Sequence, residues 1–317
     1  MRNSLTQRSP PSAWDPQALF DKATRYIQQA QDIEVDEWDY ALWSSLSLEL
    51  LARAALANIS PVLLADSGKG WAHLYNALGY EPIESRYSPR SIYISEVFRR
   101  LETILPEFTK EHESFGNLHT GRRNSELHSG EMGFDGVKAS TWQPRFYQCC
   151  EVLLTSMGMR LEDFVGSDEA TVATAMINAA ADESAKAVQG EIHAFATTWK
   201  SKPESDRTTL ADQAVVWASR QAGHRVQCPA CGSAALVFGS AVRAPVRELQ
   251  DDSIVERQEY LPDRFECIAC GLKLTGLSHL SAADVADRYT NTSYFDAAEY
   301  YAPEVDWFSF EDDNNEP

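Results

Sequence analysis

Long apolar segments are absent from this chain. No run of 18 apolar residues occurs, and the most apolar stretch, Ala41 to Ala65, contains the charged residues Glu49 and Arg53. We therefore expect no membrane-spanning helix. Residues Met1 to Pro16 also lack the apolar region of a secretory signal. These absences predict a cytoplasmic protein that does not bind a membrane.

Basic residues are scarce. The 317-residue chain has 28 Lys and Arg against 47 Asp and Glu, which gives a formal net charge of -19 at pH 7. This charge argues against a protein that coats nucleic acid through an overall positive surface, but it leaves local recognition of a nucleic acid open. With 44% hydrophobic residues the chain can form a sizeable core. Its length predicts one large domain or two to three smaller ones.

Cysteines are few, and four of the six occur in two pairs with the same spacing. Cys228-Pro-Ala-Cys231-Gly and Cys267-Ile-Ala-Cys270-Gly each place two thiols on one tight turn, and the following glycine can adopt the backbone conformation of such a turn. A reducing cytoplasm disfavours disulfides. We predict that these four thiolates bind one structural Zn²⁺ per chain, in a closed site within a module that resembles a zinc ribbon. The alternative is four free buried thiols, and binding of nucleic acid or protein by this module stays open.

The first half of the chain has helical periodicity. Apolar residues recur at steps of three and four in Ala41 to Ile59, which a proline ends, and in Ser91 to Phe108. A third helix is expected to begin around Pro144, with the adjacent thiols Cys149-Cys150 packed in the core. We assign residues 15–166 to an all-helical bundle domain.

The rest of the chain divides by composition into three segments. Residues 167–224 are rich in alanine and are interrupted at Ser201-Lys202-Pro203, which predicts a connector of two helices. Residues 225–280 hold the cysteine pairs and two β-prone runs, as expected of a small β zinc ribbon. In residues 281–317, the part after Arg288 carries eight acids and no Lys or Arg, which predicts a loosely ordered acidic tail. The predicted fold class is mainly α, with one small β module near the C-terminus.

One polar segment follows the second predicted helix. Asn124 directly follows Arg123, and His128 comes four residues later. If a short helix begins near Arg123, Asn124 and His128 share a face, and the N-terminal N–H groups of that helix attract a phosphate. The nearby His112 and His119 are expected to face solvent. The simpler interpretation is that the arginine and the histidine satisfy a helix end or a surface salt bridge.

This pattern resembles the signature of HEPN domains, which are helical nucleotide-binding bundles. Their motif is Arg, often followed by Asn, with His four to six residues after the Arg, and Arg123, Asn124 and His128 fit it. The resemblance covers roughly residues 20–165 and does not extend to the cysteine-containing module. In such domains an earlier helix often carries a polar residue that faces the site, and Glu49 is the position that matches.

The resemblance implies metal-independent RNA cleavage at a composite site formed by two protomers. A base removes the proton of the RNA 2′-OH, which attacks phosphorus and leaves a 2′,3′-cyclic phosphate and a 5′-OH. His128 then takes or gives the proton, Arg123 stabilises the phosphorane, and Asn124 orients the phosphate or the imidazole. The implied partners are an RNA substrate, a second copy of the chain in a homodimer, and an antitoxin or defence-system protein in a toxin or anti-phage setting.

Two other functions remain open at the level of sequence. The helical bundle can act as a HEPN-like adaptor that binds a nucleotide, a nucleic acid or a protein partner without chemistry. The chain can also be a transcription-related zinc-ribbon protein with a helical dimerisation domain. Charge argues against the second of these, because acids match the few arginines of the ribbon region.

Overall fold

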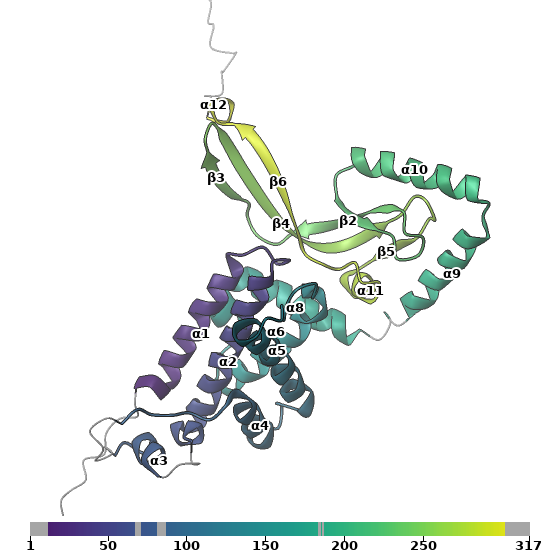
Figure 1. Cartoon of the computed structure of the whole chain (residues 1–317). Helices are drawn as coiled ribbons and strands as arrows, with labels where there is room; N and C mark the ends of the chain where they lie inside the picture. Colours follow the sequence, from purple (N-terminus) through teal and green to yellow (C-terminus); the bar gives the residue numbers. More distant parts are fainter. Residues whose placement is uncertain (1–11, 67–70, 81–86, 183–184, 186, 302–317) are drawn as a thin grey trace, which may run out of the picture.

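The computed structural model describes residues 12–66, 71–80, 87–182, 185 and 187–301. Figure 1 shows a helical part formed by the first half of the chain and, beside it, a smaller β part formed toward the C-terminus. This arrangement confirms the predicted mainly α fold with a small β module. Within the described ranges, no helix combines the length and the apolar character that a membrane span requires.

Three helices of the helical part lie where the sequence predicts them, and the part contains further helices. In chain order it contains α1 (Pro16–Gln31), α2 (Trp38–Ile59), α3 (Ala72–Ala77), α4 (Ile94–Ile104), α5 (Lys110–His128), α6 (Gln143–Ser156), α7 (Leu161–Val165) and α8 (Ser167–Ala181). The Asp15 side chain accepts a hydrogen bond from the Ala18 N–H and so caps the start of α1. Pro61 stops α2 at the predicted place, because proline cannot continue the hydrogen-bond ladder.

α2 forms the centre of this part and contacts α1, α4, α5 and α6. The core around it is aromatic: Phe98, Phe108 and Phe146 are each at most 1% exposed. Cys149 and Cys150 lie in the same core, and burial raises the pKa of both thiols. The prediction that this cysteine pair packs in the core is confirmed.

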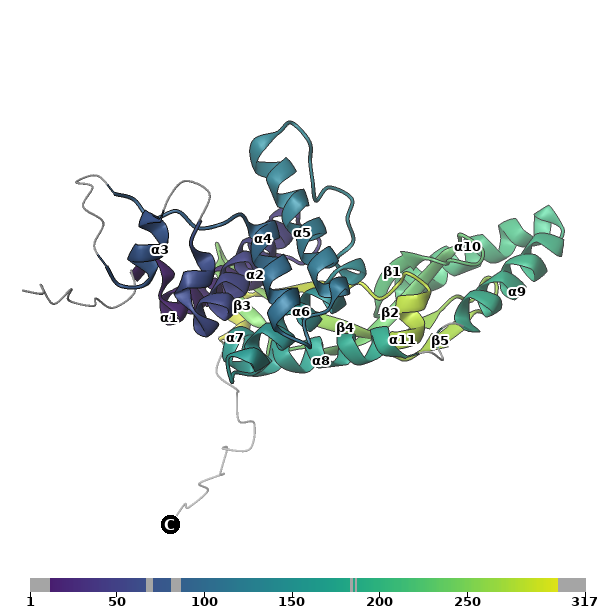
Figure 2. The same cartoon turned by 90° about the horizontal axis from the view of Figure 1, so that it is seen from below.

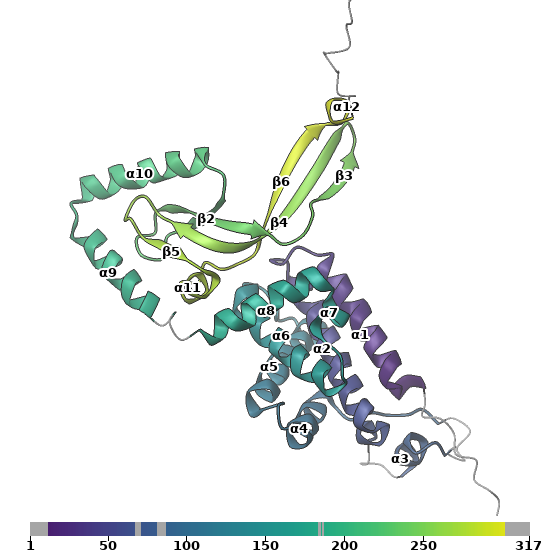
Figure 3. The ribbon, with the colours of Figure 1, turned by 180° about the vertical axis from the view of Figure 1, so that it is seen from behind.

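The alanine-rich residues 167–224, predicted to be a connector, are divided between two cores. α8 packs Met176 into the helical core. The helix also contacts α6 and α7, and Figure 3 shows the three helices from behind. α9 (Val188–Ser201) and α10 (Glu204–Arg220) pack on the β part, where Trp199 is buried. The predicted break between α9 and α10 is present. The sequence does not distinguish α8 from α9, because an amphipathic pattern shows which face is buried but not against what.

The β part is a six-stranded antiparallel sheet in which the strand order is β1-β2-β4-β3, with β5 and β6 also paired to β4. The strands are β1 (His224–Gln227), β2 (Ala234–Ala241), β3 (Val246–Gln250), β4 (Ser253–Glu266), β5 (Lys273–Thr275) and β6 (Tyr289–Asp296). The two predicted β-prone runs correspond to β2 and β4. The first half of β4 pairs with β3 and β6 in an arm that projects from the β part (Figure 1). At the irregularity between β2 and β4, a Cβ on Gly239 would lie 2.4 Å from the Leu261 carbonyl oxygen, so the strands approach too closely there for any other residue.

The acidic tail predicted for residues 281–317 differs from the structure over residues 281–301, a little more than half of its length. β6 pairs with β4 from Tyr289 opposite Tyr260 to Asp296 opposite Ser253, and α12 (Ala297–Tyr300) follows. The aromatic and threonine side chains of β6 fit a pleated strand. Residues 302–317 of the predicted tail lie outside the described residues.

A buried ion-pair network joins the two parts. Arg288, just before β6, donates hydrogen bonds of 2.6 and 2.8 Å to the two carboxylate oxygens of Glu169 on α8, and it pairs with Glu259 of β4 at 2.7 Å. Tyr147 of α6 also donates to Glu169. Burial raises the pKa of Glu169, but the charge and hydrogen bonds of Arg288 outweigh this effect and hold the pKa below its ordinary value. The network therefore fixes the β part against α6 and α8.

Candidate functional site

The four predicted metal ligands lie together in the β part. The Sγ atoms of Cys228, Cys231, Cys267 and Cys270 are all within 4.8 Å of one another. The Sγ–Sγ distance is 3.6 Å for both Cys228–Cys270 and Cys231–Cys267. Four thiolates that hold one Zn²⁺ tetrahedrally at about 2.3 Å lie about 3.8 Å apart. The cluster therefore has the size and the donor set of a tetrahedral metal site.

Both cysteine pairs have the same backbone conformation. The Gly232 N–H donates to the Cys228 carbonyl at 2.9 Å, and the Gly271 N–H donates to the Cys267 carbonyl at 2.9 Å. The two glycines have φ angles of 71° and 87°, which other residues adopt only with strain. The predicted role of the glycine after each pair is confirmed. Local turn geometry thus places both thiols of each pair.

The Arg-Asn-His segment lies at the end of a long helix and not at the start of a short one. α5 runs from Lys110 to His128, so Arg123 lies in its last two turns. The predicted attraction of a phosphate to helical N–H groups is therefore wrong, because the end of a helix presents carbonyl oxygens and the negative pole of its dipole. The helix begins earlier than predicted because Thr109 and His112 cap it and no proline interrupts it.

Arg123 and His128 point to different sides of α5. A helix has 3.6 residues per turn, so five residues place the two side chains about 140° apart around the axis. Arg123 is 8% exposed and faces the core, whereas Asn124 and His128 are exposed and share the opposite face. Figure 2 shows the last turns of α5 extending beyond the other helices. The structure thus brings together the amide and the imidazole within one chain, but not the guanidinium and the imidazole.

Arg123 is held by Glu49 on α2. One carboxylate oxygen of Glu49 pairs with Arg123, and the other accepts hydrogen bonds of 2.8 and 3.0 Å from Arg53. Burial raises the pKa of Glu49, but the charges and hydrogen bonds of Arg53 and Arg123 outweigh burial and hold the pKa below its ordinary value. Glu49 is therefore ionised at neutral pH. Of the predicted site residues, Glu49 and Arg123 are in contact, on the side of α5 away from His128.

His119 does not face solvent as predicted. It is 1% exposed, its ring lies against Trp142, and neither ring nitrogen has a hydrogen-bond partner among the described residues. Burial, together with the charges of Arg122 and Arg123, lowers the pKa of His119 to about 3. Its position one turn before Arg123, on the same face, was the signal that identifies it as inward-facing. His112 is half-buried.

Two further residues, Arg53 and Arg288, shape the surroundings of these sites, and neither was among the residues predicted from the sequence. Arg53 lies four residues after Glu49, a spacing that favours an ion pair on a helix, so its role was visible in the sequence. Arg288 is 119 residues from its partner Glu169, and no local pattern indicates that contact.

The chemistry available at the end of α5 is therefore split into two halves. One half is a carboxylate between two guanidinium groups in the partly buried space between α2 and α5, and the other is an exposed imidazole beside an exposed amide. Comparisons of this chain with models of protein families, with curated proteins and with solved structures find no match. The resemblance to HEPN domains accordingly stays a prediction from the residues themselves.

Proposed function

We propose that this protein is a metal-independent RNA endonuclease of the HEPN type. The observation that carries the proposal is the ion pair between Glu49 and Arg123, because it sets the polar residue expected from an earlier helix against the motif arginine. Asn124 and His128 supply an exposed amide and imidazole on the same helix. Attack by the 2′-OH needs a proton acceptor and a cation near the phosphate but no metal, and these residue types match that need.

The active form in this proposal is a homodimer. Within one chain His128 faces away from Arg123, so a site that uses both residues needs a second protomer. The projecting end of α5 and the segment after it carry the exposed apolar residues Leu127 and Met132, which suit a contact between two copies. A two-fold axis there brings one His128 from each protomer to the scissile phosphate, one as base and one as acid.

The proposal includes one Zn²⁺ per chain at the four-cysteine cluster. Four thiolates leave no open coordination position, so the ion stabilises the β part and takes no part in cleavage. The net charge of -19 limits indiscriminate binding of RNA. A net negative charge of this size fits a nuclease of a toxin or anti-phage system that an antitoxin or defence-system partner holds inactive.

A second function, a non-catalytic adaptor, is favoured by a different property of the same ion pair. Glu49 neutralises charge on Arg123, and little of the guanidinium is exposed to a ligand. In an adaptor this pair stabilises the contact between α2 and α5, and the exposed end of α5 binds a partner. The two functions differ in whether His128 carries out chemistry.

Replacement of His128 distinguishes the two functions. His128→Ala is expected to reduce cleavage of single-stranded RNA by about 100-fold or more, the usual contribution of a general acid or base, and to leave the fold intact because the side chain is exposed. Cleavage by the unmodified protein should proceed in EDTA, leave a 2′,3′-cyclic phosphate, and fail on RNA with a 2′-deoxy sugar at the scissile position.

The matched control is His193→Ala, which removes an exposed histidine from α9. It should cleave as the unmodified protein does. Cleavage that persists in His128→Ala, or that depends on added Mg²⁺, contradicts the nuclease proposal. RNA binding without cleavage by the dimeric protein supports the adaptor.

A further inference from the structure

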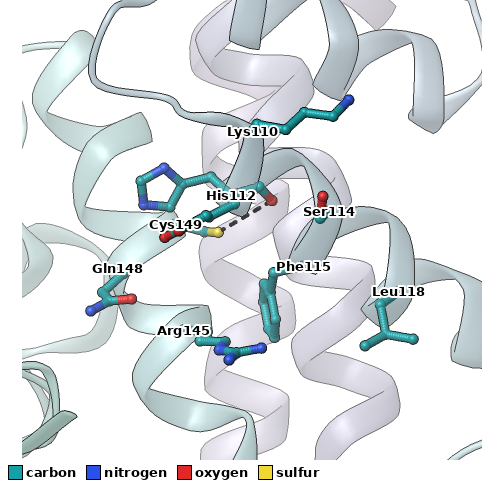
Figure 4. Close-up of a pocket in the computed structure, with 9 residues that line it drawn as sticks. Lys110, His112, Ser114, Phe115, Leu118, Arg145, Gln148 and Cys149 are labelled. Atoms are coloured by element: carbon teal, nitrogen blue, oxygen red, sulfur yellow. Dashed lines mark hydrogen bonds between the residues drawn. The ribbon is translucent and has the colours of Figure 1, made fainter. Parts of the chain in front are cut away.

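The groove between α5 and α6 is a cavity that the proposed catalytic residues do not use. Its volume is about 400 Å³, which lies in the range of small-molecule sites. Figure 4 shows its walls, formed by the first half of α5 on one side and by α6 on the other. Its lining residues are Lys110, Glu111, His112, Ser114, Phe115, Leu118, Arg145, Gln148 and Cys149.

We propose that this groove holds a nucleotide of the single-stranded RNA substrate at a distance from the scissile bond, with a phosphate at Arg145. The inference rests on the proposed function, because it names a subsite for that substrate. Single-stranded RNA is bound by cations that contact phosphates and by apolar or aromatic surfaces and amides that contact the bases. The groove supplies Arg145 for the first contact, and Phe115, Leu118 and Gln148 for the second.

The charge of the groove suits an anionic ligand. Arg145 is exposed and makes no ion pair within the described residues, so its guanidinium is free to bind a phosphate. Lys110 adds a second cation and is held by Glu113, while Glu111 is the one acid in the lining. In this acidic chain, three other cavities within the described ranges carry as many acids as Lys and Arg in their linings, or more. By the same count the lining of this groove has two cations and one acid, and Arg145 is the cation that no acid pairs with in the described part of the chain.

His112 contributes a hydrogen-bond donor to the same lining. Its Nδ1 accepts a hydrogen bond of 3.0 Å from the Thr109 N–H at the start of α5, which assigns the ring proton to Nε2. A neutral imidazole in this tautomer donates from Nε2 to a phosphate or base oxygen. The cap of α5 thus selects the donor form of His112.

The groove and the motif lie on one side of α5. Ser114, Leu118, Ser125 and His128 recur at helical spacing on the same face, so a strand that follows the helix passes both. Leu118 and His128 are ten residues apart, or about 15 Å along the axis. Arg122, partly exposed and without an ion pair in the described part of the chain, lies between them. A short single strand can therefore occupy the groove and reach the imidazole.

Binding of RNA to an inactive chain tests this inference separately from cleavage. The full-length His128→Ala protein is mixed with a fluorescently labelled single-stranded RNA of about ten nucleotides, a length within known site sizes, and anisotropy gives the affinity at several salt concentrations. Adding Arg145→Glu should weaken binding on the order of tenfold and lower the salt dependence by about one released ion. Arg25→Glu, at an exposed arginine of α1, is the matched control and should change neither quantity.

If the His128→Ala protein binds the RNA equally tightly with Arg145→Glu and with Arg25→Glu added, the subsite is overturned. The absence of RNA binding by the His128→Ala protein overturns it as well. Loss of the dimer in Arg145→Glu, with RNA affinity unchanged, shows that the groove contacts a second copy and also overturns it. Selective loss of RNA binding with no cleavage by the unmodified protein leaves the subsite standing and removes the nuclease. RNA cleavage that needs His128 but not Arg145 leaves the nuclease standing and removes the subsite.

Discussion

The four-cysteine cluster and the end of α5 differ in what places their side chains. Each cysteine pair sits on one turn whose hydrogen bonds and glycine conformation are local, and the two pairs repeat the same geometry. Arg123 is instead placed by Glu49, 74 residues earlier in the chain, and His128 by the point at which α5 ends. A spacing in sequence therefore predicts a site well when each ligand group is local, and poorly when a helix continues through the motif.

The largest expected effect concerns the cysteine cluster. Cys228→Ser combined with Cys267→Ser should abolish metal binding and unfold the β part, because a structural Zn²⁺ contributes on the order of 10 kcal/mol to the folding of a small domain. Elemental analysis of the purified protein measures the zinc, and hydrogen exchange of β2 and β4 reports the unfolding.

The matched control removes the two other cysteines, Cys149→Ala with Cys150→Ala, from the helical core. Its zinc content should stay near one per chain. Zinc retained in the first double variant, or absent from the unmodified protein, contradicts a metal site at the cluster.

Arg122 and Arg123, adjacent at the end of α5, test whether a long-range ion pair places the motif arginine. Arg123→Ala should lower the free energy of unfolding by about 2 kcal/mol, less than the usual loss on breaking a buried pair because Glu49 keeps Arg53 as a partner. Arg122→Ala should change it by less than about 0.5 kcal/mol, because Arg122 is partly exposed and has no ion pair in the described ranges. Urea unfolding of both variants gives the two values.

Equal destabilisation by the two substitutions is the result that contradicts the ion pair as the reason for the position of Arg123. Glu49→Gln provides a further check. It removes the charge that both arginines share, so it should destabilise the protein by an amount similar to that of Arg123→Ala.

A smaller effect is expected from the buried imidazole of His119. Because its folded pKa of about 3 lies below the unfolded value near 6.5, the unfolded chain binds the extra proton as the pH falls between these values, and stability decreases. From pH 6.5 to 5 this residue should cost roughly 1.5 kcal/mol. Urea unfolding at both pH values, for the unmodified protein and for His119→Phe, measures the difference.

His112 and His224 also have lowered pKa values because of burial, so the unmodified protein should lose more than this amount on acidification. The test of His119 is therefore how much more unfolding free energy the unmodified protein loses between pH 6.5 and 5 than His119→Phe does. If both lose stability equally between pH 6.5 and 5, His119 is not held neutral in the core.

Much of the helical part was predictable because its signals are local. The periodicity of α2 and α4, the proline after α2 and the proline at the start of α6 indicate helices whatever surrounds them. The start of α5 was missed because the polar motif was predicted to begin a new helix, whereas one helix runs through it. β6 was missed because it was grouped with the acids that follow it, although the strand itself holds one acid, Asp296, at its end.

The sequence by itself determined the helices that have strong periodicity, and it predicted the four-cysteine cluster, since two turns of similar geometry each present two thiols. The tertiary structure alone decided that α8 belongs to the helical core, that Arg288 meets Glu169, and that Arg123 is buried against Glu49 while His128 is exposed. The physical reason is the sequence separation over which each kind of interaction acts. Turn and helix preferences depend on neighbours a few residues away, whereas burial and long-range ion pairs depend on which surfaces the folded chain brings together.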